Sequence, residues 1–117
     1  MKVEVLYFEG CPNHESLLPH LRGLLATSGV TAEIELVQVD DHDAADRERF
    51  LGSPTVRING QDVEPGAAER DDFGLRCRLF ATREGLRGLP ADEWILAALR
   101  RAGPSPARDV DGAKRSA

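Results

Sequence analysis

The first 40 residues alternate between two kinds of apolar pattern, and this alternation constrains the fold more than any other feature of the sequence. Residues 2–8 place β-branched and aromatic side chains at every second position, which is typical of a strand. Within 12–28, leucines recur at spacings of three and four, the period of a helix with one apolar face. Residues 32–40 again predict a strand, one that is largely buried. A strand, a helix and a strand in succession predict a parallel pair with a right-handed crossover.

The next segment predicts a shorter helix followed by a hairpin. Acidic residues open a helix over 40–51, at the end where the helix dipole favours negative charge. A strand is expected at 55–58, and Asn59-Gly60 is a strong signal for a tight hairpin turn. The chain is then expected to return antiparallel over 61–64. The pattern so far predicts an α/β fold with element order βαβαββ and a mixed four-stranded sheet.

The last third of the chain is less regular. Residues 66–90 are expected to form an irregular insertion, because their apolar residues show no sustained period. Asp92 is a candidate cap for a final helix that ends near Gly103. Small, polar and charged residues at 104–117 predict a disordered tail, since they bury too little apolar surface to offset chain entropy. We therefore expect one domain over 1–103, with the order βαβαββα.

Composition excludes several functional classes. The 117 residues carry 20 acidic and 15 basic side chains, a net charge of −5, which disfavours binding to a phosphate backbone. No apolar run approaches the roughly 20 residues needed to cross a bilayer, and the N-terminus lacks a signal-peptide pattern. We expect a cytoplasmic protein with no nucleic-acid or membrane partner. Its 2 cysteines are too few for a disulfide scaffold, so their chemistry is expected to be redox or metal chemistry.

Cys11 stands directly before the helix predicted over 12–28. Unpaired N–H groups and the positive end of the helix dipole favour a thiolate at such a position. His14 lies one turn further along, where an imidazolium would act in the same direction. We therefore predict a nucleophilic Cys11 tuned by His14. The alternative is a buried and inert cysteine at a strand end.

The order βαβαββα, with a cysteine after the first strand and a proline before the third, resembles the thioredoxin-like fold. Gly10-Cys11-Pro12-Asn13-His14 stands where that family has its C-x-x-C loop, and Ser53-Pro54-Thr55 resembles its cis-proline loop. His14 replaces the family's second cysteine, so the motif here is C-x-x-H. The chain also resembles small thioredoxin-like proteins that are sometimes labelled alkylmercury lyase. The resemblance implies thiol–disulfide chemistry without a cofactor, and it leaves 66–90 as an insertion.

A cis peptide bond at Ser53-Pro54 would leave the Ser53 backbone free to pair with an extended substrate strand beside Cys11. We therefore expect Pro12, Ser53, Pro54 and Thr55 to contact substrate. The alternative is a trans proline that merely ends the second helix.

Cys77 is the second candidate thiol. Topology returns its segment to the end of the sheet that carries Cys11, so it is a candidate resolving thiol. Arg76 and Arg78 flank it, and their charges would favour a thiolate or attract an anionic thiol such as glutathione. The alternative is a short strand over 75–79 in which Cys77 faces inward.

The same residues are also candidate metal ligands. Cys11, His14 and Cys77 offer soft ligands, and two thiolates would suit Hg(II), Cu(I) or Zn(II). However, the sequence has no C-x-x-C pair, and the acidic residues at 40–43 lack the spacing of a calcium loop. We expect no resident metal and no other cofactor.

The leading hypothesis is a thioredoxin-like thiol–disulfide oxidoreductase. Cys11 attacks a disulfide, His14 tunes it, Pro54 orients the substrate, and either Cys77 or an external thiol resolves the mixed disulfide. The partner would be a protein or a low-molecular-weight thiol or disulfide. One alternative is a protein that binds soft metals or mercurials without turnover. Another is a redox-inert adaptor that uses the open end of the sheet to bind proteins.

Overall fold

The computed structural model describes residues 1–102, so the tail predicted at 104–117 lies outside the described residues. The elements in chain order are β1 (Val3–Tyr7), α1 (Asn13–Thr27), β2 (Ile34–Gln38), α2 (His42–Glu48), β3 (Thr55–Ile58), β4 (Gln61–Asp62), a 3₁₀ turn (Ala67–Glu69), β5 (Phe80–Thr82), β6 (Gly85–Arg87) and α3 (Asp92–Arg101). This order confirms a mixed α/β fold with a four-stranded sheet.

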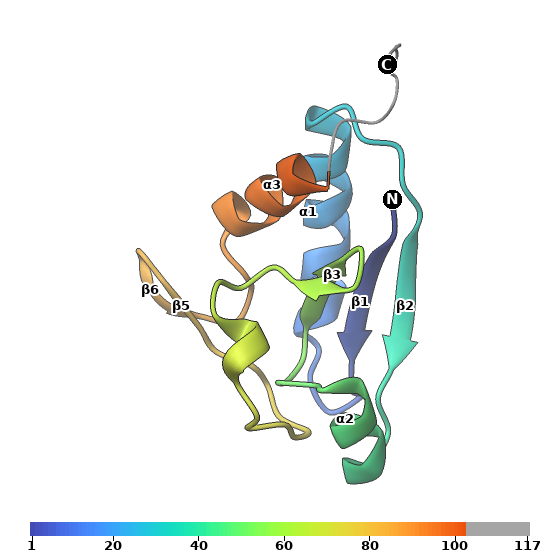
Figure 1. The fold of residues 1–117 in the computed structure, drawn as a ribbon, viewed down its shortest axis with the longest axis vertical. Coiled ribbons are helices and arrows are strands. Elements are labelled where there is room, and N and C mark those ends of the chain that lie inside the picture. Colours follow the sequence, from blue (N-terminus) through green and yellow to red (C-terminus); the bar gives the residue numbers. More distant parts are fainter. Residues whose placement is uncertain (103–117) are drawn as a thin grey trace.

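The main sheet has the strand order β2-β1-β3-β4 and is mixed (Figure 1). β1 and β2 are parallel, as the alternation of patterns predicted, whereas β3 runs antiparallel to β1 with Val5 opposite Val56. β4 returns antiparallel to β3. Asn59 and Gly60 have φ of 53° and 83°, the left-handed conformations that a two-residue hairpin turn requires. The carboxyl ends of β1 and β2 therefore point to the same edge of the sheet.

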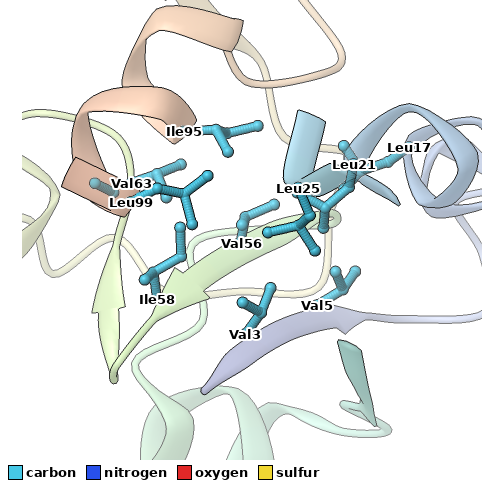
Figure 2. Packing of buried hydrophobic residues seen from close by; sticks show 11 residues of the cluster. Val3, Val5, Leu17, Leu21, Leu25, Val56, Ile58, Val63, Ile95 and Leu99 are labelled. Carbon is cyan, nitrogen blue, oxygen red and sulfur yellow. The ribbon is translucent and has the colours of Figure 1, made fainter. Parts of the chain in front are cut away.

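Helices α1 and α3 pack on one face of this sheet, and their apolar side chains form the larger core (Figure 2). The buried cluster draws on β1, β3, the residue after β4 and both helices; its members are Val3, Val5, Leu17, Leu21, Leu25, Val56, Ile58, Val63, Ile95, Ala98 and Leu99. The regular spacing of the leucines in α1 and of the alternate residues in β1 accounts for this layer, because each places its apolar residues on one side.

A smaller core lies against the opposite side of β1. Leu6 contributes to it because strand residues alternate between faces, and Val39, Ala45 and Phe50 complete it. Asp41 caps α2 by accepting a hydrogen bond from the Ala44 amide at 2.8 Å. The start of α1, the short helix α2 and the loop before β3 all gather near the carboxyl end of β1 (Figure 1).

Three details differ from the sequence-based predictions. β2 was expected to be largely buried, yet Leu36 is 49% exposed, because β2 is an edge strand with β1 as its one neighbour. Asp92 is the first residue of α3 and not its cap; its carboxylate contacts His20 Nε2 at 2.6 Å instead. Residues 66–90 contain a 3₁₀ turn and the β5–β6 hairpin, so this insertion is more regular than expected.

Among residues 1–102, the structure contains no helix with both the length and the apolar character needed to cross a membrane.

The larger core gives a direct test of the fold. Ile95 is fully buried, so Ile95→Ala should lower the free energy of unfolding by about 2–5 kcal/mol through lost burial and a residual cavity. Leu86→Ala is the matched control, because Leu86 is 67% exposed and its truncation should change stability by no more than about 0.5 kcal/mol. Urea denaturation of both variants measures the difference. Equal midpoints would contradict this packing.

Candidate functional site

Cys11 lies in the turn between β1 and α1. Its amide donates to the Phe8 carbonyl at 3.2 Å, and Pro12 is the N-cap of α1, which begins at Asn13. The Cys11 side chain is 0% exposed, and its Sγ lies 3.5 Å from the Ser53 carbonyl oxygen, to which it donates. The thiol is therefore next to the helix N-terminus, but it is covered rather than open to solvent.

The backbone of Ser53 is already paired within the chain. The Ser53 amide donates to the Arg76 carbonyl at 2.8 Å, and the Ser53 carbonyl accepts from the Arg78 amide at 2.9 Å. These bonds form a parallel bridge between Ser53 and Cys77. The peptide bond at Ser53-Pro54 is cis, but the prediction that it leaves Ser53 free for a substrate strand is wrong. Residues 74–80, here called the strap, occupy that position.

Gly52 permits this close approach. Its φ is 129°, and a Cβ placed there would lie 2.9 Å from the Cβ of Arg78 and 3.1 Å from the Arg76 carbonyl oxygen. Only glycine combines this backbone conformation with the absence of a side chain. The strap can therefore lie directly against the loop that precedes β3.

Residues alternate along the strap as in a strand. Arg78 and Phe80 are buried, whereas Cys77 and Leu79 are exposed. The alternative prediction that Cys77 faces inward is therefore wrong. Cys77 nonetheless lies beside Cys11, because the strap passes over Ser53 and both thiols flank that residue. Both cysteines are free thiols.

Contact with Cys11 changes the acidity of Cys77. A hydrogen bond with the Cys11 side chain raises the pKa of the Cys77 thiol, and burial and the charge of an ionised Cys11 act in the same direction. A neutral thiol that donates a hydrogen bond keeps its proton more firmly than a free one. The acidity of Cys77 therefore depends on the state of Cys11.

Arg78 fixes the strap from below and is 1% exposed. Its guanidinium donates to Asp62 Oδ2 at 2.8 Å, to Glu64 Oε1 at 2.5 Å and to Thr55 Oγ1 at 2.9 Å. It also lies 4.5 Å from the centre of the Phe80 ring, a cation–π contact. Arg78 and Thr55 were predicted to contact substrate, and that prediction is wrong, because both side chains are buried and bonded to each other within the fold.

Arg76 remains at the surface but is engaged by its own segment. One guanidinium nitrogen, Nη1, donates to the carbonyl oxygens of Leu51 at 3.0 Å and Asp72 at 2.6 Å. Arg70 donates two hydrogen bonds to the Asp72 carboxylate, which lower the pKa of that group to about 2. These contacts tie the beginning of the strap to the loop before Ser53. Arg76 therefore does not offer a free guanidinium to an anionic thiol.

The remaining predicted residues surround Cys11 in different ways. Pro12 is exposed, whereas Pro54 is buried with Ser53 and so has no open face toward a substrate. His14 Nδ1 donates to the Cys11 carbonyl oxygen at 3.1 Å, and its ring stacks on Tyr7 with centroids 4.2 Å apart. The contacts of His14 thus go to the backbone and to an aromatic ring. Its effect on the Cys11 thiol stays a prediction.

Sequence reasoning missed Asp62 and Glu64 as part of this site. Asp62 lies in β4, and Glu64 follows that strand. The sequence signal for them was their spacing of two around Val63, because residues two apart in an extended chain point to the same side. Ser53 Oγ is buried without a hydrogen-bond partner beside the same loop. The site therefore depends on the ion pairs of Asp62 and Glu64 with Arg78 in the strap, which no local pattern specifies.

The two thiols do not form part of a larger ligand cluster. Within residues 1–102, no group of three or more His, Cys, Asp or Glu side chains is placed to hold a metal ion. A pocket of about 610 Å³ lies nearby, between the start of α1, the β5–β6 hairpin and the start of α3. Asn13 lines it, but neither cysteine does. The pair Cys11–Cys77 is thus the chemically distinctive feature of this end of the sheet.

No protein-family model, curated protein or solved structure matches the chain. The family suggested by the C-x-x-H motif therefore stays a prediction, and the function has to follow from the chemistry of the two thiols and their surroundings.

The buried ion pairs of Arg78 predict a large stability effect. Arg78→Met keeps most of the side-chain volume but leaves Asp62 and Glu64 without their cation, so it should lower the free energy of unfolding by about 3 kcal/mol or more. Arg83→Met is the control, because Arg83 is 86% exposed and its contact with Glu93 spans 3.8 Å, which predicts a change below about 1 kcal/mol. Urea denaturation distinguishes them. Similar losses in both variants would contradict the role assigned to Arg78.

The coupling of the thiols predicts a shift in the reactivity of Cys77. In Cys11→Ala the hydrogen bond and the neighbouring charge are removed, so the pKa of Cys77 should fall toward its ordinary value. Because the thiolate is the reactive form, the pH profile of Cys77 alkylation should move to lower pH. Peptide mass analysis after timed alkylation measures this, with urea-unfolded wild-type protein as the reference. An unchanged profile would show that the sulfur atoms do not interact.

Proposed function

We propose that this domain is a thioredoxin-like thiol–disulfide oxidoreductase whose redox pair is Cys11 and Cys77. The observation that carries the proposal is the placement of two free thiols on either side of Ser53, one buried and one exposed. The arrangement around them supports the proposed class. Cys11 joins β1 to α1, and the loop with Pro54 leads into β3, the antiparallel neighbour of β1.

Accessibility assigns the order of attack. Cys11 has no exposed surface, so a substrate disulfide cannot reach its sulfur in this conformation. Cys77 is exposed and meets the substrate first. This order reverses the roles expected from the sequence, in which Cys11 attacked and Cys77 resolved. Cys11 becomes the resolving thiol, since its sulfur and the backbone of Cys77 both contact Ser53.

The proposed exchange takes place in two steps. The Cys77 thiolate attacks one sulfur of a substrate disulfide, which forms a mixed disulfide and releases one substrate thiolate. The Cys11 thiolate then attacks the Cys77 sulfur, which forms the Cys11–Cys77 disulfide and releases the second substrate thiolate. Two electrons pass from the pair to the substrate, and each released thiolate takes up a proton. An external dithiol restores the reduced pair and completes a cycle.

The coupling of the thiols sets the pH dependence of the first step. Because contact with Cys11 raises the pKa of Cys77, less of this thiol is ionised at a given pH than for a free cysteine. The rate of mixed-disulfide formation should therefore increase as the pH rises toward that pKa. The second step is favoured by proximity, because Cys11 and Cys77 both lie at Ser53. We place this chemistry in a reducing compartment such as the cytoplasm.

A second function is favoured by one observation, the isolation of the thiol pair from other ligands. Two thiolates without a third or fourth donor in the described residues suit a soft ion that accepts linear two-coordination, such as Hg(II) or Cu(I). In that case the protein would sequester the ion without turnover. Uptake of one Hg(II) that requires both cysteines, together with no disulfide formation, would favour this function.

Single cysteine variants test the oxidoreductase. Wild-type protein treated with excess glutathione disulfide should lose both thiols and form a Cys11–Cys77 bond, detected by peptide mass mapping. Cys11→Ser should stop at a mixed disulfide on Cys77, because the resolving thiol is absent. Cys77→Ser should form a mixed disulfide at least about tenfold more slowly, because Cys11 is covered.

The control for these variants is the circular dichroism spectrum, which should be unchanged because Ser and Cys have similar volumes. Absence of the Cys11–Cys77 bond in oxidised wild-type protein would refute the proposed redox pair. A fast mixed disulfide on Cys11 in Cys77→Ser would instead restore the order expected from the sequence.

A further inference from the structure

The edge at Ser53 has the form of a docking position for an extended peptide. It presents one N–H and one C=O, and a chain laid beside it can satisfy both by adding a strand. In this protein both groups are bonded to the strap, at 2.8 Å to Arg76 and at 2.9 Å from Arg78. A substrate polypeptide would have to displace these bonds before it could form its own.

The strap is held at several independent points. Arg78 is buried among carboxylates, and Phe80 is 1% exposed. Further toward the N-terminus, the Gly74 amide donates to the Phe50 carbonyl at 2.9 Å, and Arg76 Nη1 donates to the Leu51 carbonyl at 3.0 Å. Displacement of the strap would break the ion pairs of Arg78 with Asp62 and Glu64 and expose the Phe80 ring to water. An incoming peptide therefore gains little by replacing the strap.

We infer that the strap takes the place of a peptide substrate, so that polypeptide disulfides gain no advantage from strand addition and the redox pair reacts with them no faster than with low-molecular-weight disulfides. This inference depends on the proposed function. What a small disulfide needs is already at the surface: Cys77 is exposed, and so is Leu79, on the same side of the strap. It needs no hydrogen bond from Ser53. Substrate specificity therefore follows from the Ser53 amide and carbonyl, which are already hydrogen-bonded to the strap.

Two probes with the same leaving group test the inference on wild-type protein. One is the mixed disulfide of glutathione with thionitrobenzoate, and the other is a ten-residue peptide rich in β-branched residues, with a central cysteine that carries the same group. The intrinsic reactivity of each probe is first normalised with N-acetylcysteine. We expect the two normalised second-order rate constants to agree within about twofold, without saturation by the peptide.

A peptide advantage beyond that margin would overturn the inference, because two added backbone hydrogen bonds would raise the rate by about tenfold. That outcome would leave the redox pair intact if the Cys11–Cys77 bond still forms with the glutathione probe. Failure of both probes to produce that bond would remove the proposed function and the inference together. Formation of the Cys11–Cys77 bond thus tests the proposed function, whereas the ratio of the two rate constants tests the inference.

Hydrogen exchange gives a second measurement that needs no variant. The amides of Ser53 and Arg78 should be protected in the reduced protein, because both donate within the bridge. Saturating amounts of an unreactive analogue of the peptide, with serine in place of cysteine, should leave this protection unchanged. Exchange of the two amides at the rate of an unfolded chain, or loss of Arg78 protection alone when the peptide is added, would overturn the inference.

Discussion

Burial of the Arg78 guanidinium determines the arrangement of the site. An unpaired cation at that position would cost several kcal/mol, so the strap can lie against β3 only because Asp62 and Glu64 neutralise it. Adjacent residues of an extended segment face opposite ways, so fixing Arg78 inward places Cys77 outward. The position of a reactive sulfur thus follows from a structural ion pair one residue away.

The two thiols differ in solvent exposure: Cys11 is buried and Cys77 is exposed. Cys11 lies at the N-terminus of α1, and Cys77 has the solvent exposure that a substrate requires. Neither residue combines both properties. In the proposed function, a disulfide exchange that begins at the exposed Cys77 ends at the buried Cys11. The strap then supplies the second thiol, so the C-x-x-H motif needs no second cysteine in its own loop.

Local patterns predicted much of the framework. The alternation in β1, the leucine spacing in α1 and the Asn59-Gly60 turn each depend on residues close in sequence, and each appears where the pattern placed it. The predictions that failed concern residues whose role depends on a distant partner. Thr55 and Arg78 were assigned to substrate because they adjoin the candidate residues Pro54 and Cys77, but in the fold they are buried and hydrogen-bonded to each other.

The sequence by itself determined the mixed sheet, the placement of Cys11 between a strand and a helix, and the turn at Asn59-Gly60, because these follow from the intrinsic preferences of nearby residues. Only the tertiary structure decided that Cys77 lies beside Cys11 and that the Ser53 backbone is occupied. The physical reason is that hydrogen bonds and ion pairs between distant segments are set by which groups must be satisfied on burial, and that depends on the whole fold.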